Sequence, residues 1–305
     1  MTDKHKTATN YCDDRTDDCE TVLVVLLQAF GSLKGTLRLI GGLVPRYLTP
    51  ERPPEVPAHV GTTDVDVVLN IALLAARGTY DRLKRQLQNN GFTRYRPGSG
   101  GAVSTWQWEY PLNGRTVVVE FLQHTDDPSQ AARLAEIDGE DVSACQILHA
   151  GLAHDWYQEH TVTVALPHND GIVKETIRFA DAVTFIVLKA IAFNQRHEHK
   201  DTADLVHVMR YWGPIDKLVA LFSSRLKAGK HQTAIEQALN ALAANFCDEN
   251  GIAGYLKDGP AKFANFHGLV EEDSRILEQR NVSAMVTYFL RQIESQTGKG
   301  FLPGT

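Results

Sequence analysis

Cysteine is scarce in this chain of 305 residues, which has only four, at positions 12, 19, 145 and 247. Four scattered thiols exclude the dense disulfide framework of a small secreted protein, and none has the Cys-x-x-Cys spacing of common zinc sites. We therefore expect a reducing, cytoplasmic environment. Cys12 and Cys19 are expected to be surface thiols on a mobile tail rather than a zinc site.

An excess of positive charge and a long hydrophobic run are also missing. Asp and Glu (37) outnumber Lys and Arg (31), for a net charge of -6, so a nucleic acid would have to meet a local basic patch. The apolar run from Val22 to Phe30 is much shorter than the roughly 20 residues that cross a bilayer, and no membrane partner is expected. With 43% hydrophobic residues, the chain can bury a full core.

The most informative stretch is Gly61–Leu69, in which a Gly-Thr-Thr turn leads into an apolar strand with two acidic residues. Side chains alternate along a strand, so Asp64 and Asp66 share one face while Val65 and Val67 point into the core. Two neighbouring carboxylates repel each other unless a cation binds between them. Their oxygen atoms are the ligands that Mg²⁺ and Mn²⁺ prefer. Polymerases use such ions to transfer nucleotides. The alternative is a strand end with two solvated carboxylates.

Three further features extend this candidate site. The predicted strand Leu37–Ile40 runs into two glycines, whose backbone can turn sharply or lie against a phosphate. Glu120 lies near the end of a predicted strand and either completes the metal site or is merely solvated. The expected nucleotide-binding residues around the acidic strand are Gly41, Gly42, Thr62 and Thr63.

Helical and strand patterns alternate in the first part of the chain. Apolar spacing predicts helices over 22–30, ending at Gly31, and over 80–90, ending at Gly91. The proline-rich stretch 45–57 is predicted to be a loop. Hairpins are predicted over 104–122 across Asn113-Gly114, and over 161–179 across residues 168–171.

From about Asp181 to the end the pattern is helical, with a predicted loop over 251–265. This order predicts an α+β protein, with a mixed sheet and flanking helices followed by a helical C-terminal domain. The predicted parts are a polar tail (1–20), a sheet-containing domain (21–180) and a helical domain (181–305).

A second candidate site lies on the first two helices of the C-terminal half. Lys189 interrupts an apolar helix, and a buried ammonium needs an anion, unless the side chain snorkels to the edge of the core. Arg196 follows two turns later, so the two cations could grip a triphosphate. Asp201 and Asp204 share a helix face. They either orient these cations or touch a metal, or form ordinary ion pairs with Lys200 or Arg196.

Two basic clusters are candidates for contact with a polynucleotide, although such helix faces are commonly just solvated. They comprise Arg82, Lys84, Arg85, Arg94 and Arg96, with Phe92 and Tyr95 between them, and Arg210, Lys217, Arg225, Lys227 and Lys230.

The order of these motifs resembles that of AbiEii-type nucleotidyltransferases of the DNA polymerase beta-like superfamily, which include the MenT toxins. The resemblance is carried by Gly41-Gly42, by Thr63-Asp64-Val65-Asp66, by Lys189 with Arg196, and by Lys200-Asp201 with Asp204-Leu205. It spans roughly residues 35 to 210. The acidic element is shared across the superfamily, whereas the lysine helix followed by Lys-Asp-x-x-Asp-Leu is more specific.

The resemblance implies a nucleotidyltransferase-like sheet and metal-dependent transfer of a nucleotide from an NTP. In MenT-like members the acceptor is transfer RNA, translation is inhibited, and the enzyme is the toxin of a toxin-antitoxin pair, so a cognate antitoxin is a possible partner. It also implies that Asp64 and Asp66 bind Mg²⁺, that Lys189 holds the triphosphate, and that Asp201 or Asp204 is the later motif's aspartate.

Two other functions stay open from the sequence. The same chemistry could modify a small hydroxylated molecule or a protein side chain, as in antibiotic-adenylylating relatives of the superfamily. The chain could also be a nucleotide-binding module without turnover.

Overall fold

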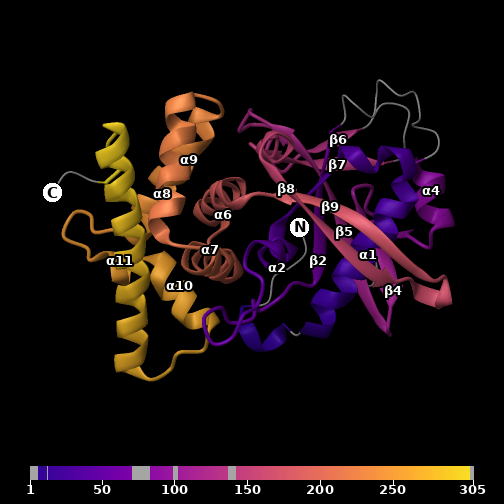
Figure 1. Ribbon diagram of the computed structural model, residues 1–305, viewed down its shortest axis with the longest axis horizontal. Coiled ribbons are helices and arrows are strands. Elements are labelled where there is room, and N and C mark those ends of the chain that lie inside the picture. The colour runs from indigo at the N-terminus through magenta and orange to yellow at the C-terminus, as the bar shows by residue number, and fades with distance from the viewer. Residues whose placement is uncertain (1–5, 12, 71–82, 99–101, 137–141, 303–305) are drawn as a thin grey trace. The chain divides into compact units, whose positions relative to one another are not determined.

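The computed structural model describes residues 6–11, 13–70, 83–98, 102–136 and 142–302, drawn in Figure 1. Internal contacts divide them into two units. Unit 1 comprises Tyr11–Tyr47 and Val60–Asp181, and unit 2 comprises Leu48–His59 and Ala182–Thr305, with residues 6–10. The division after Asp181 lies one residue from the predicted boundary, but no local pattern indicated that 48–59 groups with the helical unit.

Unit 1 is built on a mixed sheet with the strand order β3-β4-β5-β2-β1-β9-β8, and β7 joins β5 and β6. The acidic strand β2 lies between β1, which runs antiparallel to it, and β5, which runs parallel. The strands are β1 (Leu37–Ile40), β2 (Asp64–Leu69), β3 (Thr93–Arg94), β4 (Gln107–Leu112), β5 (Arg115–Thr125), β6 (Leu134–Glu136), β7 (Ser143–Leu148), β8 (Tyr157–Ala165) and β9 (Ile172–Ala180).

Both predicted hairpins are confirmed. β4 and β5 pair antiparallel up to Leu112 and Arg115, and the two turn residues have positive φ angles of 51° at Asn113 and 71° at Gly114. This is the backbone that an Asn-Gly hairpin turn favours. β8 and β9 pair along their whole length, from Tyr157 with Ala180 to Ala165 with Ile172.

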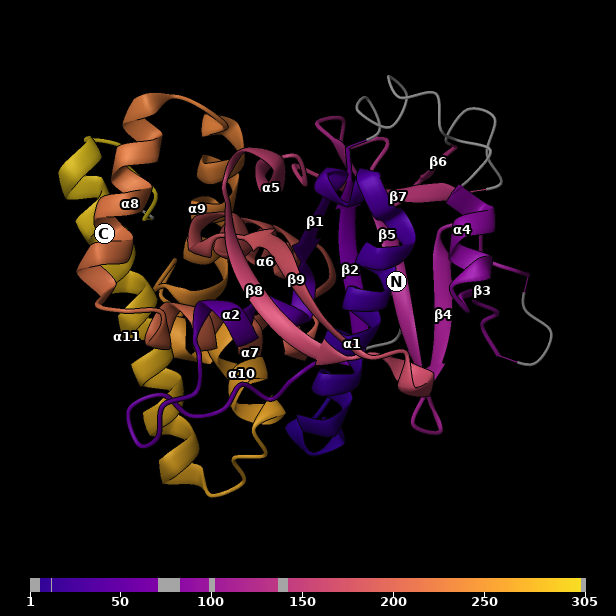
Figure 2. The same ribbon diagram turned by 45° about the vertical axis from the view of Figure 1, so that its right-hand side comes forward.

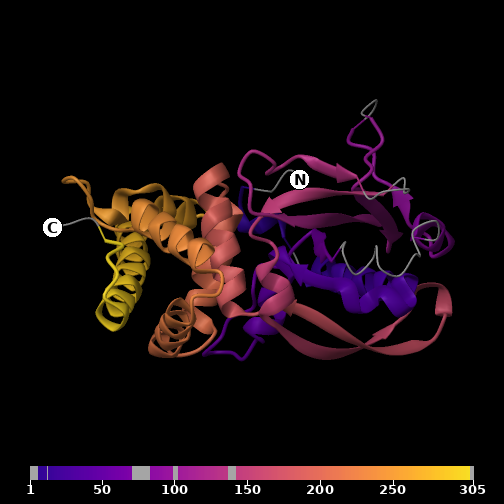
Figure 3. The ribbon, with the colours of Figure 1, turned by 90° about the horizontal axis from the view of Figure 1, so that it is seen from above.

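Helix α1 (Asp13–Phe30) begins earlier than predicted and ends, as predicted, before Gly31. It contacts β2, β4 and β5 and also β8 and β9. Figures 2 and 3 show that the β8–β9 hairpin passes along one side of α1, while β2, β4 and β5 lie on the opposite side. All residues from Val22 to Leu27 are therefore buried. Cys19 is fully buried as well, so its expected surface position is wrong, while Cys12 lies outside the described residues.

The other helices of unit 1 are short. They are α4 (Leu83–Asn89) and α5 (Leu152–Asp155), and α2 (Pro45–Leu48) ends at the first residue of unit 2. The predicted loop over 45–57 begins with the short helix α2. Its Pro45 occupies the first helical position, where the backbone N–H has no helical partner, so proline is tolerated there. Of the predicted helix over 80–90, residues 80–82 lie outside the described residues.

Unit 2 is helical, as predicted, and the α+β class is confirmed. α6 (Ala182–Arg196) packs on α7 (His199–Tyr211) and α9 (Gln232–Phe246), and α11 (Glu272–Thr297) packs on α8 (Ile215–Ala228), α9 and α10 (Asp258–Phe266). α10 replaces most of the predicted 251–265 loop. Its Gly259 and Pro260 lie in the first turn, where backbone N–H groups lack helical partners and proline is tolerated.

None of the helices in the described ranges is both long enough and apolar enough to cross a membrane.

Candidate active site

The two carboxylates of β2 are held at the middle of the unit 1 sheet. Val65 and Val67 are fully buried on the core face, so strand alternation places Asp64 and Asp66 together on the other face. Asp66 is paired with Ile40 of β1 and with Glu120 of β5. Asp64 is only 1% exposed, which contradicts a solvated position for this carboxylate, whereas Asp66 is half-buried.

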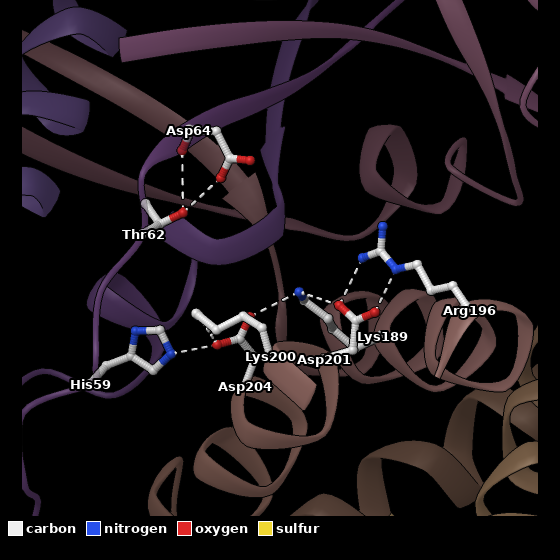
Figure 4. A network of polar contacts seen from close by, with 8 residues as sticks. All are labelled: His59, Thr62, Asp64, Lys189, Arg196, Lys200, Asp201 and Asp204. Atoms are coloured by element: carbon white, nitrogen blue, oxygen red, sulfur yellow. Dashed lines mark hydrogen bonds and ion pairs between the residues drawn. The ribbon is translucent and has the colours of Figure 1, made fainter. Parts of the chain in front are cut away.

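The turn before β2 orients Asp64. Gly61 has φ of +87°, a conformation that glycine adopts readily. The Thr62 hydroxyl then donates a hydrogen bond to Asp64 Oδ1 at 2.8 Å, shown in Figure 4. Thr63 lies between them and is half-buried.

Helix α1 fixes this turn from outside the predicted motif. The Thr62 amide donates to the Thr16 hydroxyl at 3.2 Å, and the Cys19 thiol donates to the Thr62 carbonyl at 3.8 Å. Thr16 and Cys19 are thus supporting residues that sequence reasoning missed. Nothing in the local pattern of α1 points to them, because the contacts join positions more than forty residues apart.

Gly41 is packed directly against the Asp66 carboxylate. It follows β1 with φ of +76°, and a Cβ built on it would lie 1.8 Å from Asp66 Oδ2 and 2.7 Å from its Cγ. No side chain fits in that space. The sharp turn predicted at the two glycines is present, and Gly42 is buried in it. The predicted contact of these glycines with a phosphate stays a prediction.

Glu120 lies within β5 and not near a strand end as predicted, because β5 continues to Thr125 by pairing with β7. Its side chain is 1% exposed and accepts a hydrogen bond from Gln107 Nε2 at 2.9 Å. Gln107 is a second residue that sequence reasoning missed. Across the described part of the chain, no group of three or more His, Cys, Asp and Glu side chains is arranged to hold a metal ion. The metal role of Glu120 stays a prediction.

The donor set on β2 nevertheless fits a hard cation. Mg²⁺ is commonly bound by one or two carboxylates together with water and substrate phosphates, rather than by a complete protein cage. Asp64 and Asp66 supply two carboxylates on one face, and the bare backbone of Gly41 borders one of them. These two residues would hold the ion, and phosphate oxygens would complete its coordination.

In unit 2, Lys189 of α6 is buried between two aspartates of α7. Its Nζ lies 2.9 Å from Asp201 Oδ1 and 2.8 Å from Asp204 Oδ2, as Figure 4 shows. The predicted anionic partner is confirmed, and snorkelling to the edge of the core is wrong. Burial alone would lower the pKa of Lys189, but Asp204 and Asp201 raise it above its ordinary value.

Arg196 shares Asp201 with Lys189. Its Nε lies 2.6 Å from Asp201 Oδ2 and its Nη2 lies 2.8 Å from Oδ1, a two-point contact. Burial would raise the pKa of Asp201, but Lys189 and Arg196 lower it to about 2. The sequence left two alternatives for Asp201, an ion pair with Arg196 and the orientation of Lys189. Asp201 does both.

Asp204 is fully buried among three nitrogen donors. Besides Lys189 it contacts Lys200, and its Oδ1 lies 2.8 Å from His59 Nε2. Burial would raise its pKa, but Lys189 and Lys200 hold the pKa well below its usual range. Burial and then Lys200 lower the pKa of His59 to about 4, so this imidazole is neutral at pH 7.

His59 lies two residues after the proline-rich stretch 45–57, and no spacing rule linked it to α7. The proline-rich stretch itself contacts α7 through Thr49 Oγ1 and His207 Nε2 at 3.0 Å. Both contacts lie within unit 2.

Solved structures that resemble this chain include the two described below. No family model matches the chain, and no curated protein matches it. An antigenic nucleotidyltransferase-like protein from Paracoccidioides brasiliensis is 15% identical with a TM-score of 0.39, covering 74% of this chain and 94% of that one. The protein JHP933 from Helicobacter pylori is also 15% identical with a TM-score of 0.39, covering 94% of this chain and 97% of that one.

Proposed function

We propose that this chain is a metal-dependent nucleotidyltransferase that moves a nucleotide from an NTP to a hydroxyl of RNA, with transfer RNA as the acceptor. The observation that carries the proposal is the β2 site. Asp64 and Asp66 share one face, Thr62 orients the first carboxylate, and the backbone of Gly41 packs against the second. As a biological role we propose the toxin of a toxin-antitoxin pair.

In this reaction the acceptor oxygen attacks the α-phosphorus, the bond from that phosphorus to the β-phosphate bridge breaks, and pyrophosphate leaves. A bound Mg²⁺ or Mn²⁺ would supply activation of the nucleophile and stabilisation of the leaving oxygen. Asp64 and Asp66 would hold the ion, and a nearby carboxylate would take the acceptor's proton. Gly41 and Gly42 would let phosphate oxygens lie against the backbone.

The cationic cluster of unit 2 suits the polyphosphate of the NTP. Lys189 and Arg196 would contact phosphate oxygens, and Asp201, which touches both, would position them. Asp204 would serve the same end through Lys189 and Lys200.

The direct test is to incubate the purified protein with each α-labelled NTP, Mg²⁺ and total transfer RNA. We expect labelled RNA with at least one NTP, release of pyrophosphate, and loss of both on adding a chelator, because the carboxylates alone cannot neutralise the phosphates. Labelling of an aminoglycoside or a protein without labelling of RNA would contradict the RNA acceptor. NTP binding by calorimetry without any product would contradict catalysis.

The toxin role has a separate readout in cells. Induced expression of the wild-type chain should arrest growth, and the variant without Asp64 and Asp66 should not. Unimpaired growth at a protein level that labels transfer RNA would contradict the toxin role while leaving the chemistry intact.

Gly41→Ala should slow transfer by about a hundredfold, because the new Cβ would push the Asp66 carboxylate away from its position and misplacement of about 1 Å costs that much. The matched control is Gly31→Ala. Gly31 also has a positive φ, of +52°, but has no neighbour within 4 Å of the added Cβ. Gly31→Ala should lose about 1 kcal/mol of stability because of its positive φ. Gly41→Ala should lose more, because its Cβ also overlaps the Asp66 carboxylate. Equal activity of the two variants would show that Gly41 does not act through Asp66.

A further inference from the structure

A hollow of about 460 Å³ lies in unit 2, along one face of the long helix α11. This volume is within the range of small-ligand sites, roughly 300–1,000 Å³. None of its lining residues belongs to the motifs that predicted catalysis. Its charged and aromatic members are Arg280, Arg291, Tyr255, Tyr288 and Asp248.

The two arginines form the cationic part of this hollow, which we call the α11 groove. Both are exposed, and within the described residues neither pairs with a carboxylate. They are eleven positions apart on one helix, which is about 16 Å along its axis. The carboxylate in the groove, that of Asp248, accepts the Gly254 amide at 2.6 Å. In a chain with a net charge of -6, two such arginines facing one hollow favour an anionic ligand with several charged groups.

The aromatic residues add a second kind of contact. The Arg280 guanidinium lies 4.9 Å from the centre of the Tyr255 ring. Tyr288 lies between the two arginines along the axis of α11, also lines the groove, and is 42% exposed. The Tyr288 hydroxyl donates to Asp216 Oδ1 at 2.7 Å, which holds the ring in place. Positive charge combined with an exposed aromatic ring is how proteins bind single-stranded nucleic acid, through phosphates and stacked bases.

We infer that the α11 groove binds a single-stranded segment of the RNA substrate, with Arg280 and Arg291 on different phosphates and Tyr288 stacked on a base. The choice of RNA as the ligand rests on the proposed function. The site itself differs from the two basic clusters that the sequence singled out, neither of which includes a residue of α11.

The test is fluorescence anisotropy of a short labelled single-stranded RNA with the full-length protein at several salt concentrations. The double variant Arg280→Gln, Arg291→Gln should bind about tenfold more weakly or worse. The slope of log affinity against log salt should fall by about 1.4, since each phosphate contact on a single strand contributes about 0.7. Tyr288→Ala should also weaken binding about tenfold, whereas Tyr288→Phe, which keeps the ring, should bind like wild type.

The matched control is Lys227→Gln, Lys230→Gln, which removes the same charge from exposed positions of unit 2. It should bind RNA like wild type; a loss equal to that of the arginine variant would place the RNA on the basic cluster instead. The inference is overturned if the arginine variant binds with the wild-type affinity and slope. It is also overturned if that variant loses binding of free NTP as well as RNA, since the groove would then hold the donor.

The failure of this inference is separable from failure of the proposed function. The variant Asp64→Ala, Asp66→Ala should bind RNA like wild type. Groove-dependent binding without any nucleotide transfer by the wild-type protein would leave the groove and reject the enzyme. Transfer to RNA that is unchanged in the arginine variant would leave the enzyme and reject the groove.

Discussion

The variant Asp64→Ala, Asp66→Ala is expected to transfer nucleotide at least about a thousandfold more slowly than the wild-type protein, which corresponds to about 4 kcal/mol of activation free energy. The two carboxylates are the only acidic residues of β2, and removing both takes away the ligands proposed for the metal ion. Without the ion, the charge that develops on the leaving pyrophosphate is not neutralised. The measurement is the initial rate of RNA labelling from an α-labelled NTP.

The matched control is Asp14→Ala, Asp17→Ala, which removes two carboxylates from α1 in the same unit. Their side chains are 80% and 62% exposed, so transfer should stay near the wild-type rate. Because Asp64 is buried and hydrogen-bonded to Thr62, thermal unfolding of each variant is needed beside the rates. A folded Asp64→Ala, Asp66→Ala protein with wild-type labelling would reject the β2 site.

Single asparagine variants would separate the two carboxylates. Asp66→Asn keeps the shape that packs against Gly41 but removes the charge, so its stability should be unchanged while transfer falls. Asp64→Asn keeps a side-chain oxygen that can still accept from the Thr62 hydroxyl. A loss in both variants would identify charge rather than shape as the requirement.

Strand alternation and turn chemistry carried most of the unit 1 prediction, because both are local. The Asn-Gly dipeptide forces a tight turn whatever surrounds it, and the β2 pattern fixes which side chains face the core. The length of α1 was underestimated for the opposite reason. Its first turns are polar and helical periodicity does not reveal them; they are ordered by contacts with distant segments, such as that of Thr16 with Thr62.

Local sequence patterns predicted only some of the residues that contact the site residues. A lone lysine in an apolar helix requires an anion, so Asp201 and Asp204 could be expected from helix spacing. His59 could not, because it lies 145 positions from Asp204 and follows a proline-rich stretch that was predicted to be a loop. Glu120 was placed near a strand end because apolar alternation weakens after Leu122, yet parallel pairing with β7 continues the strand through polar residues.

Lys189→Met is expected to lower the free energy of unfolding by about 3 kcal/mol, because it leaves two buried carboxylates without their shared ammonium. Asp201 and Asp204 are 1% and 0% exposed, so water cannot replace the lost partner. The matched control is Lys262→Met. Lys262 lies 3.0 Å from Asp258 Oδ2, but that pair is 22% and 53% exposed, and its loss should cost less than about 1 kcal/mol. Urea unfolding followed by helical circular dichroism measures both.

A second substitution distinguishes two causes of the stability loss, an unpaired buried carboxylate and the lost packing of the lysine side chain. Asp201→Asn added to Lys189→Met should restore at least about 1 kcal/mol, because Arg196, the remaining partner of Asp201, is 27% exposed and can be hydrated. Asp204→Asn should restore less, since it would strand Lys200, which is only 3% exposed. If neither asparagine restores stability, the cost of Lys189→Met comes from packing of the side chain in α6, and the ion-pair network does not account for the burial of Lys189.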